Sequence, residues 1–250
     1  MSVPSPISVV EEMRARISSI GAPARPASTI AFGAEEVDAR LACGGIAADA
    51  LHEVCGSSPG LADEAAATLF LAGIASRAGG TVLWAVVRFD LYAPGLEQVG
   101  LTPDRVIFHE ARDDVGVLAA MEDALRHGGL GAVVGEVKRA DMTASRRLQL
   151  ASAAGGTPAF LFRKWRRRDV CPLTENSAAT TRWRVGSAPS APLGVPGVGR
   201  SRWSVELARQ RNGAPFSMIL EGCDAEGRIA VPAAAADRAP AQERASARAA

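Results

Sequence analysis

The feature that most constrains the fold is a series of short, uninterrupted apolar runs separated by segments with helical periodicity. Residues 81–87 read Thr-Val-Leu-Trp-Ala-Val-Val, and residues 132–137 read Ala-Val-Val-Gly-Glu-Val. Runs of this kind are typical of strands that are buried on both faces of a parallel sheet. Further strands are expected at residues 51–54, 105–109 and 158–162, with helical segments at 61–77, 94–99, 115–126 and 145–154. The alternation predicts an α/β fold with a mostly parallel, twisted sheet flanked by helices.

The pattern of apolar and polar residues changes after residue 163. Residues 182–185 and 202–207 alternate between apolar and polar side chains, and residues 216–221 form one more apolar segment. These segments predict a small C-terminal antiparallel β extension. The first two share an Arg-Trp-x-Val pattern, which places Trp183 and Trp203 on one face of the extension. Both rings are expected either in the core or in an exposed contact site for a partner.

The two ends of the chain differ from its centre. Residues 1–20 predict an N-terminal helix, in which Val9, Met13 and Ile17 share one face, and residues 21–40 read as a linker. Residues 232–250 consist of small, charged and proline residues without a bulky hydrophobe, so a disordered tail is expected. The sequence therefore predicts one domain, from residue 41 to residue 231.

Composition excludes several classes of protein. The net charge of +1 gives no overall attraction to nucleic acid. The four cysteines and three histidines lie far apart and without metal-ligand spacing, so neither a metal site nor a disulfide framework is expected. The N-terminus lacks the features of a signal peptide, and no apolar run is long enough to span a membrane. A cytoplasmic protein is expected.

A set of short motifs carries a family resemblance. Leu41-Ala-Cys-Gly-Gly-Ile46 and Leu51-His-Glu-Val-Cys-Gly56 are similar to the approach to the P-loop in RecA. Further motifs follow in order: Asp90-Leu-Tyr-Ala-Pro-Gly95, Thr143-Ala-Ser-Arg-Arg-Leu-Gln-Leu150, Ala178-Ala-Thr-Thr-Arg-Trp-Arg-Val185 and Arg202-Trp-Ser-Val-Glu-Leu207. Taken together, they resemble the ImuA family of RecA-like proteins. The RecA-like part of this resemblance covers roughly residues 41–185.

The resemblance implies a RecA-like core and a role in the SOS response to DNA damage. Members of this family act in mutagenic translesion DNA synthesis, beside the polymerase-like protein ImuB and an error-prone replicative-type DNA polymerase. The resemblance therefore implies ImuB and RecA as partners, and it implies association with the nucleoid during DNA damage.

The expected phosphate-binding loop departs from that of a working ATPase. It reads Gly56-Ser57-Ser58-Pro59-Gly60 and lacks the Gly-Lys-Ser or Gly-Lys-Thr triplet that neutralises phosphates and holds Mg²⁺. Matching the family's pattern places Ala65 to Ala67 at that triplet, Arg88 at the catalytic glutamate and Glu136 at the acid that supports magnesium. We therefore expect no ATPase activity and no cofactor. The alternative is weak nucleotide binding by a vestigial site of Gly56, Ser57, Ser58, Gly60 and Glu136.

A basic segment follows the last expected strand of the parallel array. Residues 163–168 read Arg-Lys-Trp-Arg-Arg-Arg, and arginine beside a stacking aromatic ring suits single-stranded DNA. An acidic surface of a partner protein suits the same residues, and a solvated loop is the third alternative. The candidate contact residues are Arg146, Arg147, Arg163, Lys164, Trp165, Arg166, Arg167 and Arg168, together with Trp183 and Trp203.

No nucleophile, base and orienting group occur in a recognisable pattern, so the sequence predicts a binding module rather than an enzyme. Two alternatives remain open at this point. One is a RecA-like protein with residual ATP-dependent DNA binding, and the other is an inhibitor of cell division similar to SulA.

Overall fold

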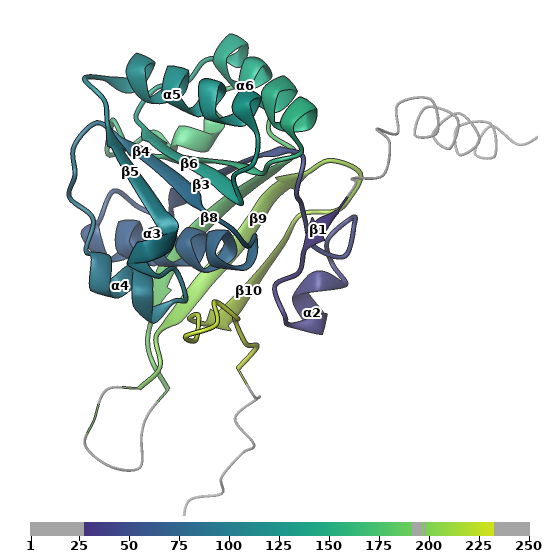
Figure 1. Ribbon diagram of the computed structural model, residues 1–250. Coiled ribbons are helices and arrows are strands. Elements are labelled where there is room, and N and C mark those ends of the chain that lie inside the picture. The colour runs from purple at the N-terminus through teal and green to yellow at the C-terminus, as the bar shows by residue number, and fades with distance from the viewer. Residues whose placement is uncertain (1–27, 192–196, 198, 233–250) are drawn as a thin grey trace, which may run out of the picture.

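The computed structural model describes residues 28–191, 197 and 199–232. Its main element is an eight-stranded sheet with the order β10-β9-β8-β3-β7-β6-β4-β5 (Figure 1). The six strands from β8 to β5 are parallel, whereas β9 and β10 join the β8 side antiparallel. The strands are β3 (Leu51–Gly56), β4 (Val82–Val86), β5 (Val106–Glu110), β6 (Ala132–Val137), β7 (Ala159–Arg163), β8 (Thr181–Ala188), β9 (Arg202–Gln210) and β10 (Phe216–Glu221). The predicted fold class, a mostly parallel sheet with an antiparallel C-terminal extension, is confirmed.

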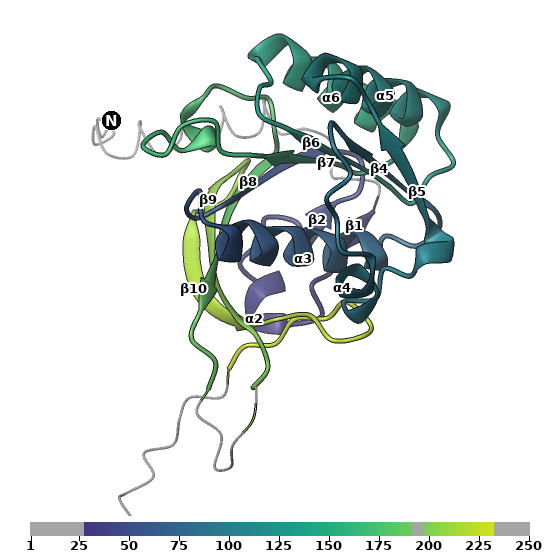
Figure 2. The same ribbon diagram turned by 90° about the vertical axis from the view of Figure 1, so that its left-hand side faces the viewer.

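Helices cover both faces of this sheet. The helices α5 and α6 lie on one face, and α3 and α4 lie on the other, with β8 to β10 curving around α3 (Figure 2). The helices are α2 (Glu35–Asp38), α3 (Leu61–Arg77), α4 (Ala93–Gln98), α5 (Asp114–His127) and α6 (Met142–Gly155), and the 3₁₀ turns are η1 (Pro103–Arg105) and η2 (Pro172–Thr174). Within the described ranges, no helix has both the length and the apolar character needed to cross a membrane.

The α3 face of the sheet holds an aromatic cluster. The ring of Phe70 lies 5.6 Å from the rings of Phe32 and Trp183 and 6.2 Å from the ring of Trp203. Trp183 and Trp203 are 1% and 3% exposed, so the prediction that they form a contact site for a partner is wrong. Their alternate positions on β8 and β9 point toward α3, where Phe70 and Phe32 complete the packing.

The linker predicted for residues 21–40 is wrong in its described part. Strand β1 (Thr29–Ile30) pairs antiparallel with β2 (Ile46–Ala47), and Phe32 is fully buried against α3. The guanidinium of Arg77 donates a hydrogen bond of 2.6 Å to the carbonyl of Phe32. Because these residues contribute apolar surface to the core, the packed domain begins before residue 41. The predicted helix within residues 1–20 lies outside the described residues, as does the predicted tail after Pro232.

Candidate functional site

The carboxyl ends of β3, β4, β6 and β7 border a pocket of about 520 Å³. In open α/β sheets, ligands bind in the crevice at this edge. The pocket is lined by Pro59, Glu64, Val87, Arg88, Asp90, Asp114, Glu136, Val137, Lys138, Lys164 and Trp165. The predicted P-loop therefore borders the pocket together with the start of the basic segment.

The backbone of the predicted P-loop is engaged with the protein itself. The N–H of Ser57 donates to the carbonyl of Val185 at 2.8 Å, and the N–H of Gly60 donates to the Ser58 hydroxyl at 3.2 Å. The carbonyl of Gly56 accepts a 2.9 Å hydrogen bond from the indole of Trp165. A phosphate-binding loop must instead present free N–H groups to its ligand. Two N–H groups of this loop, those of Ser57 and Gly60, are therefore already engaged within the protein.

Helix α3 begins at Leu61, directly after this loop. Asp63 and Glu64 therefore occupy its first turn, where carboxylates interact favourably with the helix dipole. Asp63 accepts a 2.8 Å hydrogen bond from the N–H of Ser187. The alignment of residues 65–67 with the phosphate-binding triplet is wrong, because these residues lie in the second turn, past the end that faces the pocket.

The ammonium of Lys164 lies among three carboxylates in the pocket. Its Nζ is 2.8 Å from Oε2 of Glu136, 3.2 Å from Oε1 of Glu64 and 3.5 Å from Oδ1 of Asp90. These acids come from β6, from the first turn of α3 and from the segment after β4. The chain thus places a cation of its own next to Glu136, the acid expected to support magnesium.

Burial and the neighbouring charges shift the pKa values of Glu136 and Lys164. Burial raises the pKa of Glu136, although the nearby ammonium and the indole of Trp84, which donates to Oε1 at 2.8 Å, oppose that rise. Burial lowers the pKa of Lys164, but the attraction of Glu136, Glu64 and Asp90 outweighs it, so that its pKa lies above the usual range. Lys164 is therefore a permanent cation at physiological pH.

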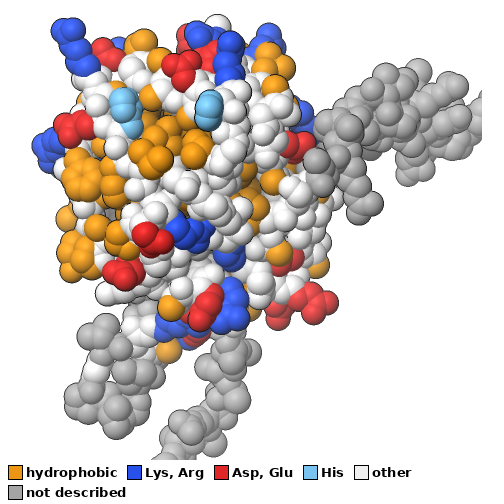
Figure 3. Space-filling model, in the orientation of Figure 1, with side chains coloured by type: hydrophobic (Ala, Val, Ile, Leu, Met, Phe, Trp, Pro, Cys, Tyr) orange, Lys and Arg blue, Asp and Glu red, His pale blue; other side chains and the backbone are white. Residues whose placement is uncertain are grey.

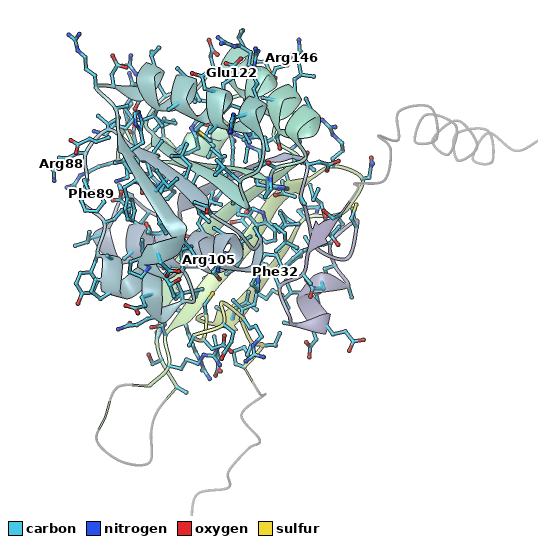
Figure 4. All side chains as sticks on the ribbon, viewed as in Figure 1. Phe32, Arg88, Phe89, Arg105, Glu122 and Arg146 are labelled. Atoms are coloured by element: carbon cyan, nitrogen blue, oxygen red, sulfur yellow. The ribbon has the colours of Figure 1, made fainter. Side chains whose placement is uncertain are left out.

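Arg88, which the family's pattern places at the catalytic glutamate, differs in its surroundings from its near neighbour Asp90. Arg88 is exposed at the mouth of the pocket and extends away from the sheet (Figure 4). Asp90, two residues further on, is the residue of this segment that reaches Lys164. The next loop is positioned by Asp114, whose carboxylate accepts the N–H groups of Lys138 and Arg139 at 3.2 and 3.0 Å.

Arg163 does not belong to a contact surface, so this part of the prediction is wrong. Its fully buried guanidinium lies 3.1 Å from Glu53 and 2.5 Å from Glu175. The other oxygen of the Glu53 carboxylate is 2.7 Å from Nε of Arg182. Buried charges require such pairing. The residue is the last of β7, and its side chain points to the same side of the sheet as Glu53, beneath the segment that leads to β8.

The other predicted contact residues fall on two separate elements. Arg166, Arg167 and Arg168 are exposed in the loop after β7, whereas Lys164 and Trp165 anchor the start of this loop in the pocket. Arg146 and Arg147 are exposed on α6. Figure 4 shows Arg146 in the outer helical layer. Arg147 forms an ion pair with Glu122 of α5. The exposed part of the basic segment is thus a cluster of three arginines, which we call the arginine loop (Arg166–Arg168).

A second surface, which is apolar and was not predicted, lies beside the pocket along β5, the last strand of the sheet. Within the described part of the chain, β5 pairs with β4 alone, so its other edge is open. Hydrophobic side chains gather over β5 and α4 (Figure 3). We call this the β5 edge surface, and it consists of the exposed residues Val87, Phe89, Tyr92 and Ile107. Phe89 packs edge to face on Phe108 at 4.9 Å.

The described residues contain no group of three or more His, Cys, Asp or Glu arranged to hold a metal ion. The predicted site residues thus resolve into a pocket with an internal cation, an exposed arginine loop and buried structural groups.

Comparison with known proteins decides the family. No family model matches the chain. Protein ImuA from two strains of Caulobacter vibrioides is 39% identical over 211 residues, which cover 80% of this chain and 86% of the relative. The chain belongs to the ImuA family. The crystal structure of the RadB recombinase superimposes on this ImuA-family chain with a TM-score of 0.57. It covers 82% of the chain and 100% of RadB at 15% identity, so the likeness establishes a common fold alone.

Proposed function

We propose that this ImuA-family chain is a non-catalytic accessory protein of damage-induced mutagenesis. In this proposal it acts in the SOS response, through protein contacts that support translesion DNA synthesis and without binding or hydrolysing ATP. Its partners are ImuB, RecA or both, and ImuB connects it to an error-prone replicative-type DNA polymerase. Membership of the ImuA family supports the process, and the pocket supports the absence of ATP chemistry.

The observation that carries the proposal is the position of Lys164. Its ammonium is paired with Glu136, Glu64 and Asp90, where a nucleotide-binding protein of this fold would place phosphates and a metal ion. A bound triphosphate would either displace this lysine or lie against three carboxylates. Like charges 4 Å apart repel by roughly 1–4 kcal/mol at dielectric constants between those of water and a protein surface. Nucleotide binding would therefore be unfavourable.

The β5 edge surface is the partner-binding surface in this proposal. An open strand edge binds an extended segment through main-chain hydrogen bonds, while alternate side chains of the segment enter flanking apolar sites. Phe89 packs on Phe108 on one face of β5, and Ile107, the adjacent residue of the strand, points to the other face. Strand β5 contains no proline, and its one acidic residue is Glu110 at the carboxyl end, so the run from Val106 to Phe108 lacks the charges that commonly block edge strands.

The arginine loop offers a second contact, to single-stranded DNA. Three phosphate contacts on a single strand would give a slope of log affinity against log salt of roughly −2. Arg163 adds nothing to this value because it is buried, and Lys164 adds nothing because it is paired with carboxylates. We expect this contact to be weak and secondary to the protein contacts.

Complementation of a deletion strain tests the proposal. Ile107→Asp places a charge in the β5 edge surface, and Leu150→Asp is a matched control, because these side chains are 53% and 65% exposed and lie on different elements. We expect the deletion and Ile107→Asp to abolish damage-induced mutation, and Leu150→Asp to retain it. Full induced mutation in the deletion strain would refute the function. Full activity of Ile107→Asp would refute the assignment of the surface.

A further inference from the structure

A groove lies between α5 and α6, the two helices on the face of the sheet away from α3 (Figure 2). We call it the α5–α6 groove, and its volume is about 470 Å³. An ion pair between Glu122 of α5 and Arg147 of α6 holds the two helices side by side. The apolar part of the lining consists of Val115, Leu118, Ala119, Ala140, Ala144 and Leu148.

The groove leaves apolar side chains in contact with solvent. Val115 is 74% exposed, although it lies on a helix whose other side is buried. Ala119 is also exposed, and it lies one turn further along the same side of α5. Exposed apolar surface that is gathered in one place is typical of an interaction site. Because the ion pair fixes the two helices, this site exists before anything binds to it.

The chain itself contains a segment with the pattern that such a groove accepts. Residues 1–27 lie outside the described part of the chain. In their sequence, Val9, Met13, Ile17 and Ile20 are spaced so that they form one apolar stripe of a helix. A short helix is only marginally stable in water and depends on the packing of its apolar face. The stripe therefore requires a surface to cover it.

The chain enters the described structure beside the carboxyl ends of α5 and α6. Ser28 borders one pocket together with Leu130, which follows α5, and Gly156, which follows α6. The carbonyl of Ser28 accepts a 3.0 Å hydrogen bond from the N–H of Ala48, ahead of β3. Helix α6 packs on β3 and β7. The point of entry is therefore next to the two helices that form the groove.

The connecting residues are long enough to bring the stripe to the groove. Residues 21–27 separate Ile20 from Ser28, and they include Pro23 and Pro26. A proline-rich segment extends by about 3.1 Å per residue, so this connection spans roughly 22 Å. Each of α5 and α6 has 14 residues and is therefore about 21 Å long. The stripe can thus reach the whole length of the groove in its own chain.

The other apolar surface and the other end of the chain fit less well. Strand β5 lies four strands from β3 in the sheet, which corresponds to about 19 Å. Phe89 and Tyr92 of the β5 edge surface follow the carboxyl end of β4, whereas Ser28 lies ahead of the amino end of β3. Residues 232–250 contain no bulky hydrophobe that could fill the groove.

We propose that residues 9–20 pack as an amphipathic helix in the α5–α6 groove of the same chain. The apolar stripe of this helix covers Val115 and Ala119, and transfer of these side chains out of water stabilises the contact. The N-terminal segment is then an arm that covers the helical layer of its own domain. The β5 edge surface and the arginine loop remain accessible, because they lie on other elements.

The labelling rate of a cysteine placed in the groove of the full chain tests the proposal. Ala119→Cys lies in the groove, and Ala153→Cys is its matched control, because this alanine is also exposed but lies outside the lining. Each variant reacts with iodoacetamide, and peptide mass spectrometry reports the rate at the new cysteine. The reference for an open groove is the same chain with Met13→Asp and Ile17→Asp, which place two charges in the stripe.

If the segment is docked in about 90% of the molecules, labelling of Ala119→Cys should be about tenfold slower than in the open reference, because only the undocked fraction reacts. Ala153→Cys should react equally fast in both chains. Ser18→Asp, on the opposite face of the predicted helix, should leave the slow rate unchanged.

Equal labelling of Ala119→Cys with and without the two charges in the stripe would overturn the proposal. A slow rate that rises when the protein is diluted would also overturn it, because the groove would then hold the segment of another molecule. Neither result depends on the role of the chain in mutagenesis, so the two proposals fail separately.

Discussion

Replacement of Lys164 by methionine provides a quantitative test of the pocket. The substitution retains the length of the side chain and removes the ammonium that Glu136, Glu64 and Asp90 share. Removal of one partner from a fully buried ion pair costs roughly 3–5 kcal/mol. The side chain of Lys164 is 21% exposed, and those of Glu64 and Asp90 are 37% and 41% exposed, so solvent screens part of the interaction. We expect a loss of about 2–3 kcal/mol in the free energy of unfolding.

The loss should depend on pH in a defined direction. Without the ammonium, the pKa of Glu136 in the folded state should lie further above its value in the unfolded state, because burial is no longer opposed. The folded state then binds more protons than the unfolded state, and stability falls as pH rises through this range. The penalty of Lys164→Met should therefore be larger at pH 8 than at pH 5, and it should shrink in the Glu136→Gln background.

Urea unfolding at the two pH values, with the wild-type chain measured in parallel, is the appropriate assay. A loss of this size corresponds to a decrease in melting temperature of roughly 5–10 °C. Lys138→Met is the matched control, because this neighbouring lysine is exposed and its replacement should change stability by less than about 0.5 kcal/mol. An equal penalty at pH 5 and pH 8, or a penalty no larger than that of Lys138→Met, would refute the reasoning.

Three further substitutions test other parts of the structure. Glu53→Gln should cost about 3 kcal/mol in urea unfolding at pH 7, because it leaves the guanidinium groups of Arg163 and Arg182 without their shared carboxylate; a loss below about 1 kcal/mol would contradict this. Burial lowers the pKa of His52 from 6.5 to about 4. Between these two pH values the unfolded chain binds a proton that the folded chain does not bind, so the wild type loses stability as pH falls. When the pH is lowered from 7 to 4.5, the free energy of unfolding of His52→Gln should therefore fall by about 2.5 kcal/mol less than that of the wild type. Equal decreases in the two proteins would contradict this prediction. Gly155→Ala should lower the free energy of unfolding by about 1–3 kcal/mol, because the added Cβ would lie 2.1 Å from a carbonyl oxygen of α5. An unchanged melting temperature would contradict this, because it would mean that α5 and α6 move apart without loss of stability.

Much of the fold follows from local sequence patterns. The apolar run at 132–137 and the helical periodicity at 61–77 predict β6 and α3 with the bounds that are observed. Strand β6 is apolar because it is buried on both faces, and α3 is long and rich in apolar residues because most of its second half is buried. The segment from Thr29 to Asp38 was harder to assign, because β1 and α2 are too short to show a period and prolines precede them.

The chemistry of the pocket was not predictable in the same way. Glu64, Asp90 and Glu136 belong to three different elements, and only the folded chain brings them to Lys164. In the sequence, this lysine belongs to the basic segment 163–168, and nothing local distinguishes it from the exposed arginines that follow Trp165. The burial of Arg163 is equally non-local, because its partner Glu53 is on another strand.

The folded chain also decides the burial of Trp183 and Trp203. The two tryptophans were assigned to one face by their period, but only the position of α3 decided that this face is buried.

Titration of the full chain with ATP and with ADP in the presence of Mg²⁺, followed by isothermal calorimetry, tests the central claim most directly. The claim is that the chain's own lysine takes the place of nucleotide and metal in a RecA-like fold. We predict no binding of either nucleotide up to millimolar concentration, with the wild-type Lys164 pairs intact. Micromolar binding would contradict the claim, because it would require the pocket to release Lys164 from its three carboxylates and the Gly56–Gly60 loop to turn its N–H groups toward the phosphates.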